Sequence, residues 1–104
     1  PRDASGYLTP GTLGPTRVVP QSILAPEYVG RQSPREHEGD DVYSAHQIDL
    51  IRAAGTIAAG AIEAAGAAIA PGMTTNELDA IAHEYVISHG AYPSTLGYRG
   101  YPKS

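Results

Sequence analysis

Apolar residues recur at intervals of three and four between residues 45 and 70, which predicts one long helix with an apolar face. Ser44 stands before this pattern as a helix cap, and Gln47 three residues later completes a capping box. Pro71-Gly72 should end the helix, because proline cannot continue the hydrogen-bond ladder and glycine tolerates the reversal. The positions of the expected apolar face are Ile48, Ile51, Ala54, Gly55, Ala58, Ile62, Ala65 and Ile69.

A second helix is predicted directly after this turn. Thr74 or Thr75 caps it, and Glu77 stands three residues after Thr74, which is again a capping box. His89 lies in its last turn and Gly90 ends it. The apolar face comprises Leu78, Ile81, Ala82, Tyr85 and Val86. Beyond Gly90 we expect turns and extended chain, with a strand that starts at residues 94–96.

Three glycines lie inside the first predicted helix, at positions 55, 60 and 66. Each costs about 1 kcal/mol relative to alanine in a helix interior. We therefore expect these glycines to let a neighbouring element pack closely, although a helix that is merely weak would show the same composition.

Residues 1–43 differ in composition from residues 44–104, and we expect a proline- and glycine-rich extension and linker followed by a separate folded part. Proline fixes φ and removes a backbone donor, which favours extended chain over helix. Residues 22–30 (SILAPEYVG) carry four larger apolar side chains and should lie on the surface of the following part. Residues 31–41 contain no apolar side chain and read as a solvated linker.

Composition limits what this chain can do alone. It has 104 residues, 41% of them hydrophobic, but no Phe, no Trp and no Cys. Alanine supplies much of the apolar content and buries little area, so we expect a thin core and either a larger fold or a partner. The net charge of −4 and scattered basic residues make nucleic acid an improbable ligand. Arg52 and Glu63 interrupt the longest apolar segment, so no membrane helix is expected, and a cytoplasmic location fits.

No complete catalytic site is visible in the pattern. The four histidines have no metal-ligand spacing: His83-Glu84 begins like HExxH, but position 87 is Ile87. Asp79 stands four residues before His83, so we expect the two to pair on the helix surface. No metal ligand and no catalytic residue is therefore assigned within residues 1–104.

The closing stretch is the segment with binding character. Tyr98 and Tyr101 could face one cavity if Arg99-Gly100 forms a turn, and Thr95 could complete its wall. Gly97 would let the backbone approach a ligand or a neighbouring strand. Such a cavity would suit a slim aliphatic side chain. Ordinary turn aromatics that pack under a loop would produce the same pattern.

The sequence from Pro71 onward resembles type I methionine aminopeptidase. The matching runs are PGMTTNELD (71–79), IAHEY (81–85), GAYPS (90–94) and LGYRGYPKS (96–104). Residues 25–30 (APEYVG) resemble the arm ahead of the catalytic domain in longer, actinobacterial-like members with an N-terminal extension. Met73 stands where the family usually has valine, and an isoleucine replaces its usual methionine before Arg52.

The resemblance implies an α/β pita-bread fold, of which residues 1–104 would supply the arm, two helices and the start of the antiparallel sheet. It implies removal of the initiator methionine from new proteins, assisted by two divalent metal ions (Co, Mn, Fe, Zn or Ni). The ligands, two Asp, one His and two Glu, would all lie beyond Ser104, so residues 1–104 alone should be inactive. Thr95, Tyr98 and Tyr101 match positions that line the methionine side-chain pocket, and Thr95 replaces a cysteine of many bacterial relatives.

The implied partner is the N-terminal methionine of a nascent peptide, with the ribosome as a further candidate and a monomer as the expected state. Two other readings stay open at this point. One is a pita-bread protein that has lost its metal ligands and acts as a binding protein. The other is a helical hairpin with a proline-rich arm that docks on partners.

Overall fold

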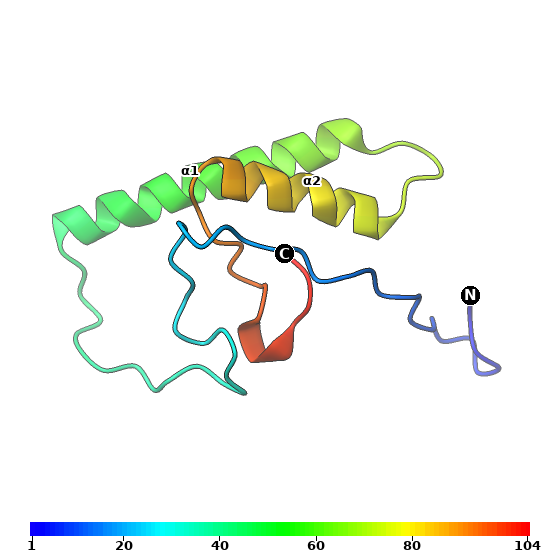
Figure 1. Cartoon of the computed structure of the whole chain (residues 1–104), viewed down its shortest axis with the longest axis horizontal. Coiled ribbons are helices and arrows are strands. Elements are labelled where there is room, and N and C mark those ends of the chain that lie inside the picture. The colour runs from blue at the N-terminus through cyan, green and yellow to red at the C-terminus, as the bar shows by residue number, and fades with distance from the viewer.

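The computed structural model describes all 104 residues and consists of two helices, a short 3₁₀ turn and long irregular segments. Helix α1 spans Ala45–Ala68, helix α2 spans Thr75–Ser88, and the 3₁₀ turn η1 spans Tyr98–Gly100. The two helices run antiparallel and pack along one another (Figure 1). The amino-terminal arm (residues 1–30) and the carboxyl-terminal stretch (residues 90–104) lie side by side beneath α2. The extreme amino terminus projects away from this body.

Both helices begin where the sequence predicts, because each predicted capping box forms. The Ser44 side chain accepts from the Gln47 amide, and the Gln47 side chain accepts from the Ser44 amide at 2.8 Å. Thr74 and Glu77 repeat this arrangement at the start of α2, with 2.7 Å between the Thr74 amide and Glu77 Oε2. These reciprocal bonds satisfy amide groups that have no partner inside the helix.

The ends of the helices lie close to the predicted positions. Helix α1 stops at Ala68, two residues before the expected end, and Gly72 turns the chain with φ 90°. Helix α2 stops at Ser88, so His89 is its C-cap, and Gly90 follows with φ 74°.

The face that α1 presents to α2 is not the face expected from its isoleucines. Ala61 is buried and Gly60 lies against Tyr85, whereas Ile51 and Ile62 are 53% and 74% exposed. The prediction was wrong because the larger side chains would hold the helices apart, and a face of Gly and Ala allows closer packing. The residues of α1 that are at least partly covered are Ile57, Gly60, Ala61, Ala64, Ala65 and Ala68.

Close packing at a glycine is confirmed at one of the three predicted positions. A Cβ on Gly60 would lie 2.5 Å from Cζ of Tyr85, well inside van der Waals contact. A Cβ on Gly55 or Gly66 would meet nothing within 4 Å. Gly60 therefore marks the helix crossing, and the other two weaken α1 without a packing gain.

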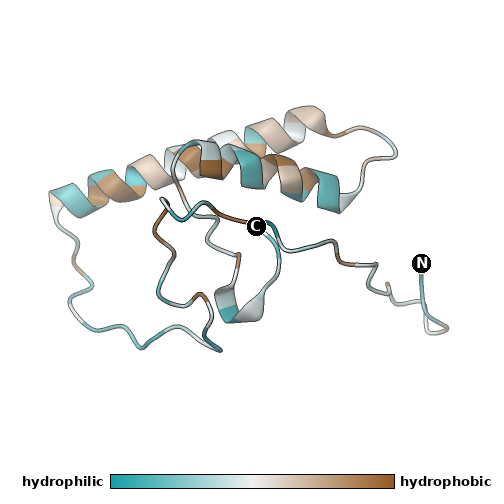
Figure 2. Cartoon of the chain, viewed as in Figure 1, coloured by the Kyte–Doolittle hydropathy of each residue, from teal (hydrophilic) through white to brown (hydrophobic).

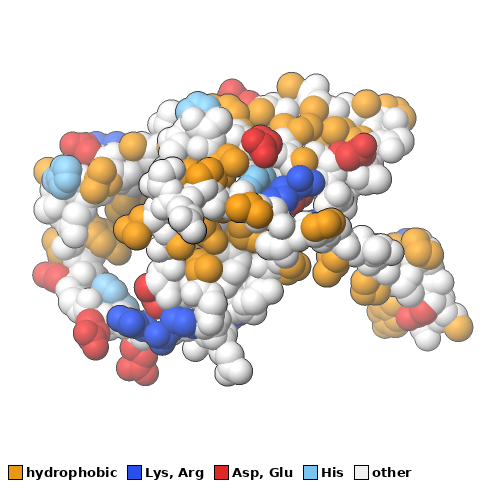
Figure 3. Space-filling view, in the orientation of Figure 1, with side chains coloured by type: hydrophobic (Ala, Val, Ile, Leu, Met, Phe, Trp, Pro, Cys, Tyr) orange, Lys and Arg blue, Asp and Glu red, His pale blue; other side chains and the backbone are white.

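The core is thin, as the alanine-rich composition predicts. Only Ala61, His83, Pro93 and Leu96 are buried. The radius of gyration is 16.5 Å, against about 13 Å for a compact domain of 100 residues. Hydrophobic residues recur along both helices (Figure 2), and hydrophobic side chains lie exposed on the face of the molecule that Figure 3 shows.

Helix α1 has the length and composition of a helix that could cross a membrane, contrary to the expectation drawn from Arg52 and Glu63. Alanine and isoleucine outweigh the few charges in this window, so Arg52 and Glu63 do not exclude such a helix by composition. Helices that pack inside proteins can meet the same two criteria, and α1 packs along α2. A charge at the centre of a bilayer would cost roughly 2.5–3.5 kcal/mol on insertion scales, so the absence of a membrane partner stays our prediction.

The structure contains no β-strand, and its one ladder element is an isolated bridge between Arg2 and Leu8. The strand expected from residues 94–96 is a turn that leads into η1. A strand needs a neighbour that pairs with its amide and carbonyl groups, and no β-ladder includes these residues. The boundary between residues 1–43 and 44–104 stays a prediction, since the arm and the later residues pack on one another.

Candidate substrate-binding site

The stretch after helix α2 is bent by three residues with positive φ: Gly97 at 81°, Arg99 at 49° and Gly100 at 77°. Backbone bonds close the turn, with 2.7 Å from the Gly97 amide to the Tyr101 carbonyl and 2.9 Å from the Tyr101 amide to the Tyr98 carbonyl. The turn that was expected at Arg99-Gly100 is therefore present. Tyr98 and Tyr101 flank this turn and line the same hollow.

The three residues predicted to bind substrate line one hollow. Thr95, Tyr98 and Tyr101 surround an open cavity of about 530 Å³. Tyr98 and Tyr101 are 43% and 54% exposed, so both rings are accessible to a ligand. The remaining lining residues are Arg99, Gly100 and Pro102.

Thr95 does not point freely into the hollow. Its hydroxyl donates to the carbonyl of Lys103 at 3.1 Å. This bond ties the two edges of the turn together, so the Thr95 hydroxyl already has a partner within the chain.

Arg99 belongs to this site, although the sequence indicated only a turn at its position. Its guanidinium lies 5.6 Å from the centre of the Tyr98 ring, within the range of a cation–π contact. Arg99 is also the only non-glycine residue with positive φ. A positive charge at the rim of an apolar hollow gives it one polar corner.

The amino-terminal arm supports the turn from behind. Tyr28 donates a short hydrogen bond to the Ser94 carbonyl, and its ring meets the Tyr98 ring edge-on with 5.3 Å between centroids. Gly97 faces Val29, since a Cβ there would lie 3.4 Å from Val29 Cγ2. The expected docking of residues 22–30 is confirmed for Tyr28 and Val29, whereas Leu24 is 92% exposed. The side of Gly97 without a Cβ faces the arm rather than a strand or ligand.

A second hollow of about 560 Å³ lies between the arm and the turn. Nine residues between Thr16 and Val29 line one side, and the other side is lined by Tyr92, Leu96, Gly97, Gly100 and Tyr101. Tyr101 thus stands between the two hollows. Tyr101 lines this second hollow, whereas Thr95 and Tyr98 do not.

Burial raises the pKa of the Tyr28 hydroxyl above its usual value near 10, and the neighbouring Tyr92, Tyr98 and Glu27 raise it further. The ionised phenolate would lose the hydrogen bond that it donates to Ser94. The neutral form is therefore the one that holds the arm on the turn.

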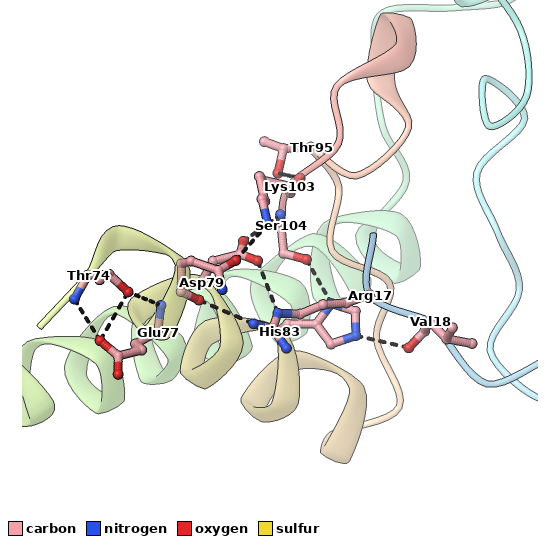
Figure 4. Close-up of polar contacts among 10 residues, drawn as sticks. Arg17, Val18, Thr74, Glu77, Asp79, His83, Thr95, Lys103 and Ser104 are labelled. Carbon is pink, nitrogen blue, oxygen red and sulfur yellow. Dashed lines mark hydrogen bonds and ion pairs between the residues drawn. The ribbon is translucent and has the colours of Figure 1, made fainter. Parts of the chain in front are cut away.

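Polar contacts join the arm, α2 and the end of the chain in a group that we call the clamp: Arg17, Val18, Asp79, His83 and Ser104 (Figure 4). Arg17 Nε donates to Asp79 Oδ2 at 3.2 Å, and the Ser104 amide donates to Asp79 Oδ1 at 2.8 Å. His83 lies 2.7 Å from the Ser104 hydroxyl and 3.0 Å from the Val18 carbonyl.

The expected surface pair between Asp79 and His83 is wrong. The two side chains do not bond to one another, and His83 is fully buried. Both instead hold Ser104, which approaches α2 from 21 or more residues along the chain. Helical spacing indicates that Asp79 and His83 share a face, but it cannot reveal what lies on that face.

Two of the other three histidines, His37 and His89, have local partners. His37 lies 3.2 Å from Asp41 in the linker, and His89 stacks on Tyr85 with 4.2 Å between ring centroids. No three His, Asp or Glu side chains meet in a group that could hold a metal ion. The side chains of residues 1–104 therefore do not fit a metal centre.

Comparison with known proteins adds the family. The model of metallopeptidase family M24 matches residues 49–104. Methionine aminopeptidase 2 of Mycobacterium tuberculosis is 57% identical over 97 residues, which cover 93% of this chain and 34% of that protein. Methionine aminopeptidase 1D, chloroplastic/mitochondrial, of Arabidopsis thaliana is 44% identical over 98 residues, covering 93% of this chain and 28% of that protein.

The human mitochondrial methionine aminopeptidase 1D is 37% identical over 105 residues, covering 99% of this chain and 31% of that protein. The chain thus spans about a third of the length of the curated relatives it matches. These matches confirm the resemblance to methionine aminopeptidases that the closing stretch carries. They do not favour the non-catalytic readings.

Proposed function

Because the chain belongs to metallopeptidase family M24, we propose that it forms the substrate-binding part of a methionine aminopeptidase. Such an enzyme removes the initiator methionine from new proteins by hydrolysis of the first peptide bond. The proposal draws on relatives that carry this name and on the hollow at the end of the chain. The observation that carries it is the meeting of Thr95, Tyr98 and Tyr101 around one cavity.

The hollow has the chemistry that a methionine side chain needs. Two accessible tyrosine rings offer faces and edges to a thioether, and contacts between sulfur and aromatic rings contribute roughly 0.3–1.5 kcal/mol each. The threonine methyl and Pro102 add apolar wall. A slim unbranched side chain could lie between the rings, while a charged one would lose its hydration.

No group of side chains in residues 1–104 fits the metal ions of the family. When bound, two divalent ions would activate water and polarise the scissile carbonyl. We propose that the two Asp, one His and two Glu that hold such ions come from sequence outside residues 1–104, as the threefold greater length of the relatives allows. Which of Co, Mn, Fe, Zn or Ni is used belongs to the same proposal. The residues present contribute binding and orientation of the substrate.

The remaining features of the proposal concern fold, location and partners. We propose that α1, α2 and the following turn are the entry to the pita-bread fold of the family. We also propose that the protein acts on nascent chains in the cytoplasm as a monomer, and that the ribosome is a further partner. Some relatives are named as chloroplastic or mitochondrial.

The test is an NMR titration of the 104-residue chain with the dipeptide Met-Ala, with Lys-Ala as the control ligand. We expect shift changes centred on Thr95, Tyr98 and Tyr101 with Met-Ala and much weaker ones with Lys-Ala. Tyr101→Ala should abolish the preference, whereas Tyr7→Ala, in the exposed amino-terminal turn, should keep it. Shifts centred on Val19 and Leu96, or equal shifts with both peptides, would contradict the proposal.

A second measurement concerns catalysis. The purified chain should release no methionine from Met-Ala with or without added divalent metal, because its side chains do not fit a metal centre. Release of methionine that a chelator stops would show that the assignment of all metal ligands to other sequence is wrong.

A further inference from the structure

His83 is the one large side chain that is buried to 1% exposure, and both of its ring nitrogens have partners. Nδ1 lies 2.7 Å from Ser104 Oγ, and Nε2 lies 3.0 Å from the carbonyl oxygen of Val18. The three residues come from α2, the end of the chain and the arm. His83 is therefore placed where three segments distant in sequence meet (Figure 4).

The chemistry of these partners determines the hydrogen positions. A carbonyl oxygen can only accept, so Nε2 must carry the hydrogen. A neutral imidazole has a single N–H, which leaves Nδ1 as an acceptor for the Ser104 hydroxyl. In this tautomer the Ser104 hydroxyl donates to Nδ1 of His83, and the Nε2–H of His83 donates to the Val18 carbonyl.

Ser104 in turn is connected to the substrate hollow. Its amide donates to Asp79 on the same helix as His83, at 2.8 Å. The preceding residue, Lys103, accepts from the Thr95 hydroxyl at 3.1 Å and donates through Nζ to Asn76 Oδ1 at 2.7 Å. The two ends of the stretch 95–104 are thus bonded together, and one of them is anchored on α2.

We infer that His83 is a positioning residue: with Nε2–H donating to the Val18 carbonyl and Nδ1 accepting from the Ser104 hydroxyl, it fixes Ser104 on α2 and so sets the place of the wall formed by Thr95, Tyr98 and Tyr101. The assignment of this wall to substrate binding rests on the proposed function. The tautomer and the coupling of His83 to Ser104 do not.

A histidine that merely fills space would not need one tautomer or two separable bonds. Long-range ¹H–¹⁵N NMR of the imidazole nitrogens in the unmodified chain should show a protonated Nε2 and an unprotonated Nδ1 for His83. The exposed His46 is the internal control and should show the tautomer mixture of a free imidazole. The same mixture at His83, or a hydrogen on Nδ1, would overturn the inference.

Two amide variants separate the two bonds. In His83→Gln the amide nitrogen can replace Nε2 and donate to Val18, while the acceptor for Ser104 is lost. In His83→Asn the amide oxygen can replace Nδ1 and accept from Ser104, while the donor to Val18 is lost. We expect the Ser104 and Gly97 amides to exchange with solvent roughly five- to tenfold faster in the Gln variant, as the loss of one hydrogen bond implies, and nearly unchanged in the Asn variant.

Ser104→Ala completes the comparison. It should speed exchange of these amides as His83→Gln does, and the double variant should show no further increase, because both changes remove the same bond. Equal acceleration in the Gln and Asn variants, or additive effects in the double variant, would show that His83 supports the fold generally without positioning Ser104. The peptide titration with Met-Ala is independent, so failure of the proposed function would leave these outcomes readable.

Discussion

Tyr28 of the arm and Tyr98 of the turn meet edge to face, with 5.3 Å between ring centroids and an interplanar angle of 84°. The positive edge of one ring lies on the negative face of the other, which is a favoured arrangement for aromatic pairs. Seventy residues separate the two positions in sequence. The contact therefore makes the arm part of the wall that carries the candidate site.

Replacement of Tyr28 tests this support. Tyr28→Phe removes the hydrogen bond to Ser94 and keeps the ring, so the free energy of unfolding should fall by about 1 kcal/mol. Tyr28→Ala also removes the ring pair and should lower it by roughly a further 0.5–1.5 kcal/mol beyond lost burial. Urea unfolding followed by circular dichroism measures both. Equal loss in the two variants would mean that the ring contact contributes nothing.

The same tyrosine predicts a pH dependence at the alkaline end. Its pKa is raised in the folded state, mainly by burial. Below about pH 10 the hydroxyl is neutral in both states and its contribution to stability is fully present. As the pH rises through the folded-state pKa, the unfolded chain loses its proton first, so stability falls. The midpoint of unfolding should decrease above about pH 10, and Tyr28→Phe should show a shallower decrease.

Alanine at position 60 should have the opposite effect on stability to alanine at position 55 or 66. Gly60→Ala would bring a methyl group against Tyr85, which is itself stacked on His89, and should destabilise the chain by roughly 1–3 kcal/mol. Gly55→Ala and Gly66→Ala meet open space and should stabilise α1 by up to about 1 kcal/mol each. Thermal unfolding of the three variants tests this order.

A matched control for Gly60→Ala removes the obstacle instead of the glycine. In a Tyr85→Ala background the added methyl group has room, so Gly60→Ala should become neutral or stabilising. If Gly60→Ala destabilises the chain equally with and without Tyr85, the helix crossing inferred here does not limit residue 60.

The two capping boxes differ by one charge, which makes each a control for the other. The Thr74 amide and hydroxyl lower the pKa of Glu77 through their hydrogen bonds to its carboxylate. A lowered folded-state pKa adds stability above the unfolded value of about 4.3, and this stability is lost as the pH falls through the folded-state pKa. The start of α2 should therefore fray in acid, measured as faster exchange or shift changes of the Thr74 and Glu77 amides.

The start of α1 uses the uncharged Gln47 in the same role and should show no such change. Glu77→Gln should give α2 the same insensitivity while keeping the box. Fraying of both helix starts over the same pH range would point to general acid unfolding instead.

Asp79 is predicted to matter more than an exposed acid with a similar partner. Asp79→Ala removes acceptors for Arg17 and for the Ser104 amide, and should lower the free energy of unfolding by roughly 1–3 kcal/mol. Asp79→Asn keeps an acceptor oxygen for Ser104 and should cost less. Asp49→Ala breaks only the exposed pair with Arg52, worth about 0–1 kcal/mol. Equal losses of stability at Asp79 and Asp49 would contradict a stabilising role of the clamp.

The local elements were readable from sequence because their causes are local. Ser44, Gln47, Thr74 and Glu77 make capping boxes with partners three residues away, so pattern alone located the start of each helix. The turn at Arg99-Gly100 also follows from residues within it, and with it came the grouping of Tyr98, Tyr101 and Thr95. Their role in substrate binding stays a prediction.

Contacts between distant segments could not be read in the same way. Isoleucine spacing indicated an apolar face on α1, yet α2 packs on the glycine and alanine face, since close helix approach depends on small side chains facing Tyr85. The expected strand at residues 94–96 is absent, because a strand exists only where a neighbour supplies its hydrogen bonds.

The sequence alone determined the two capped helices, the proline-rich arm and the tyrosine-bearing turn, and it carries the family resemblance. Only the tertiary structure decided that His83 and Asp79 face Ser104 and the arm, and that Tyr28 lies against Tyr98. The physical reason is the range of the interactions. Capping and turn formation involve neighbours along the chain, whereas burial and long-range hydrogen bonds depend on which distant residues the fold brings within about 3 Å.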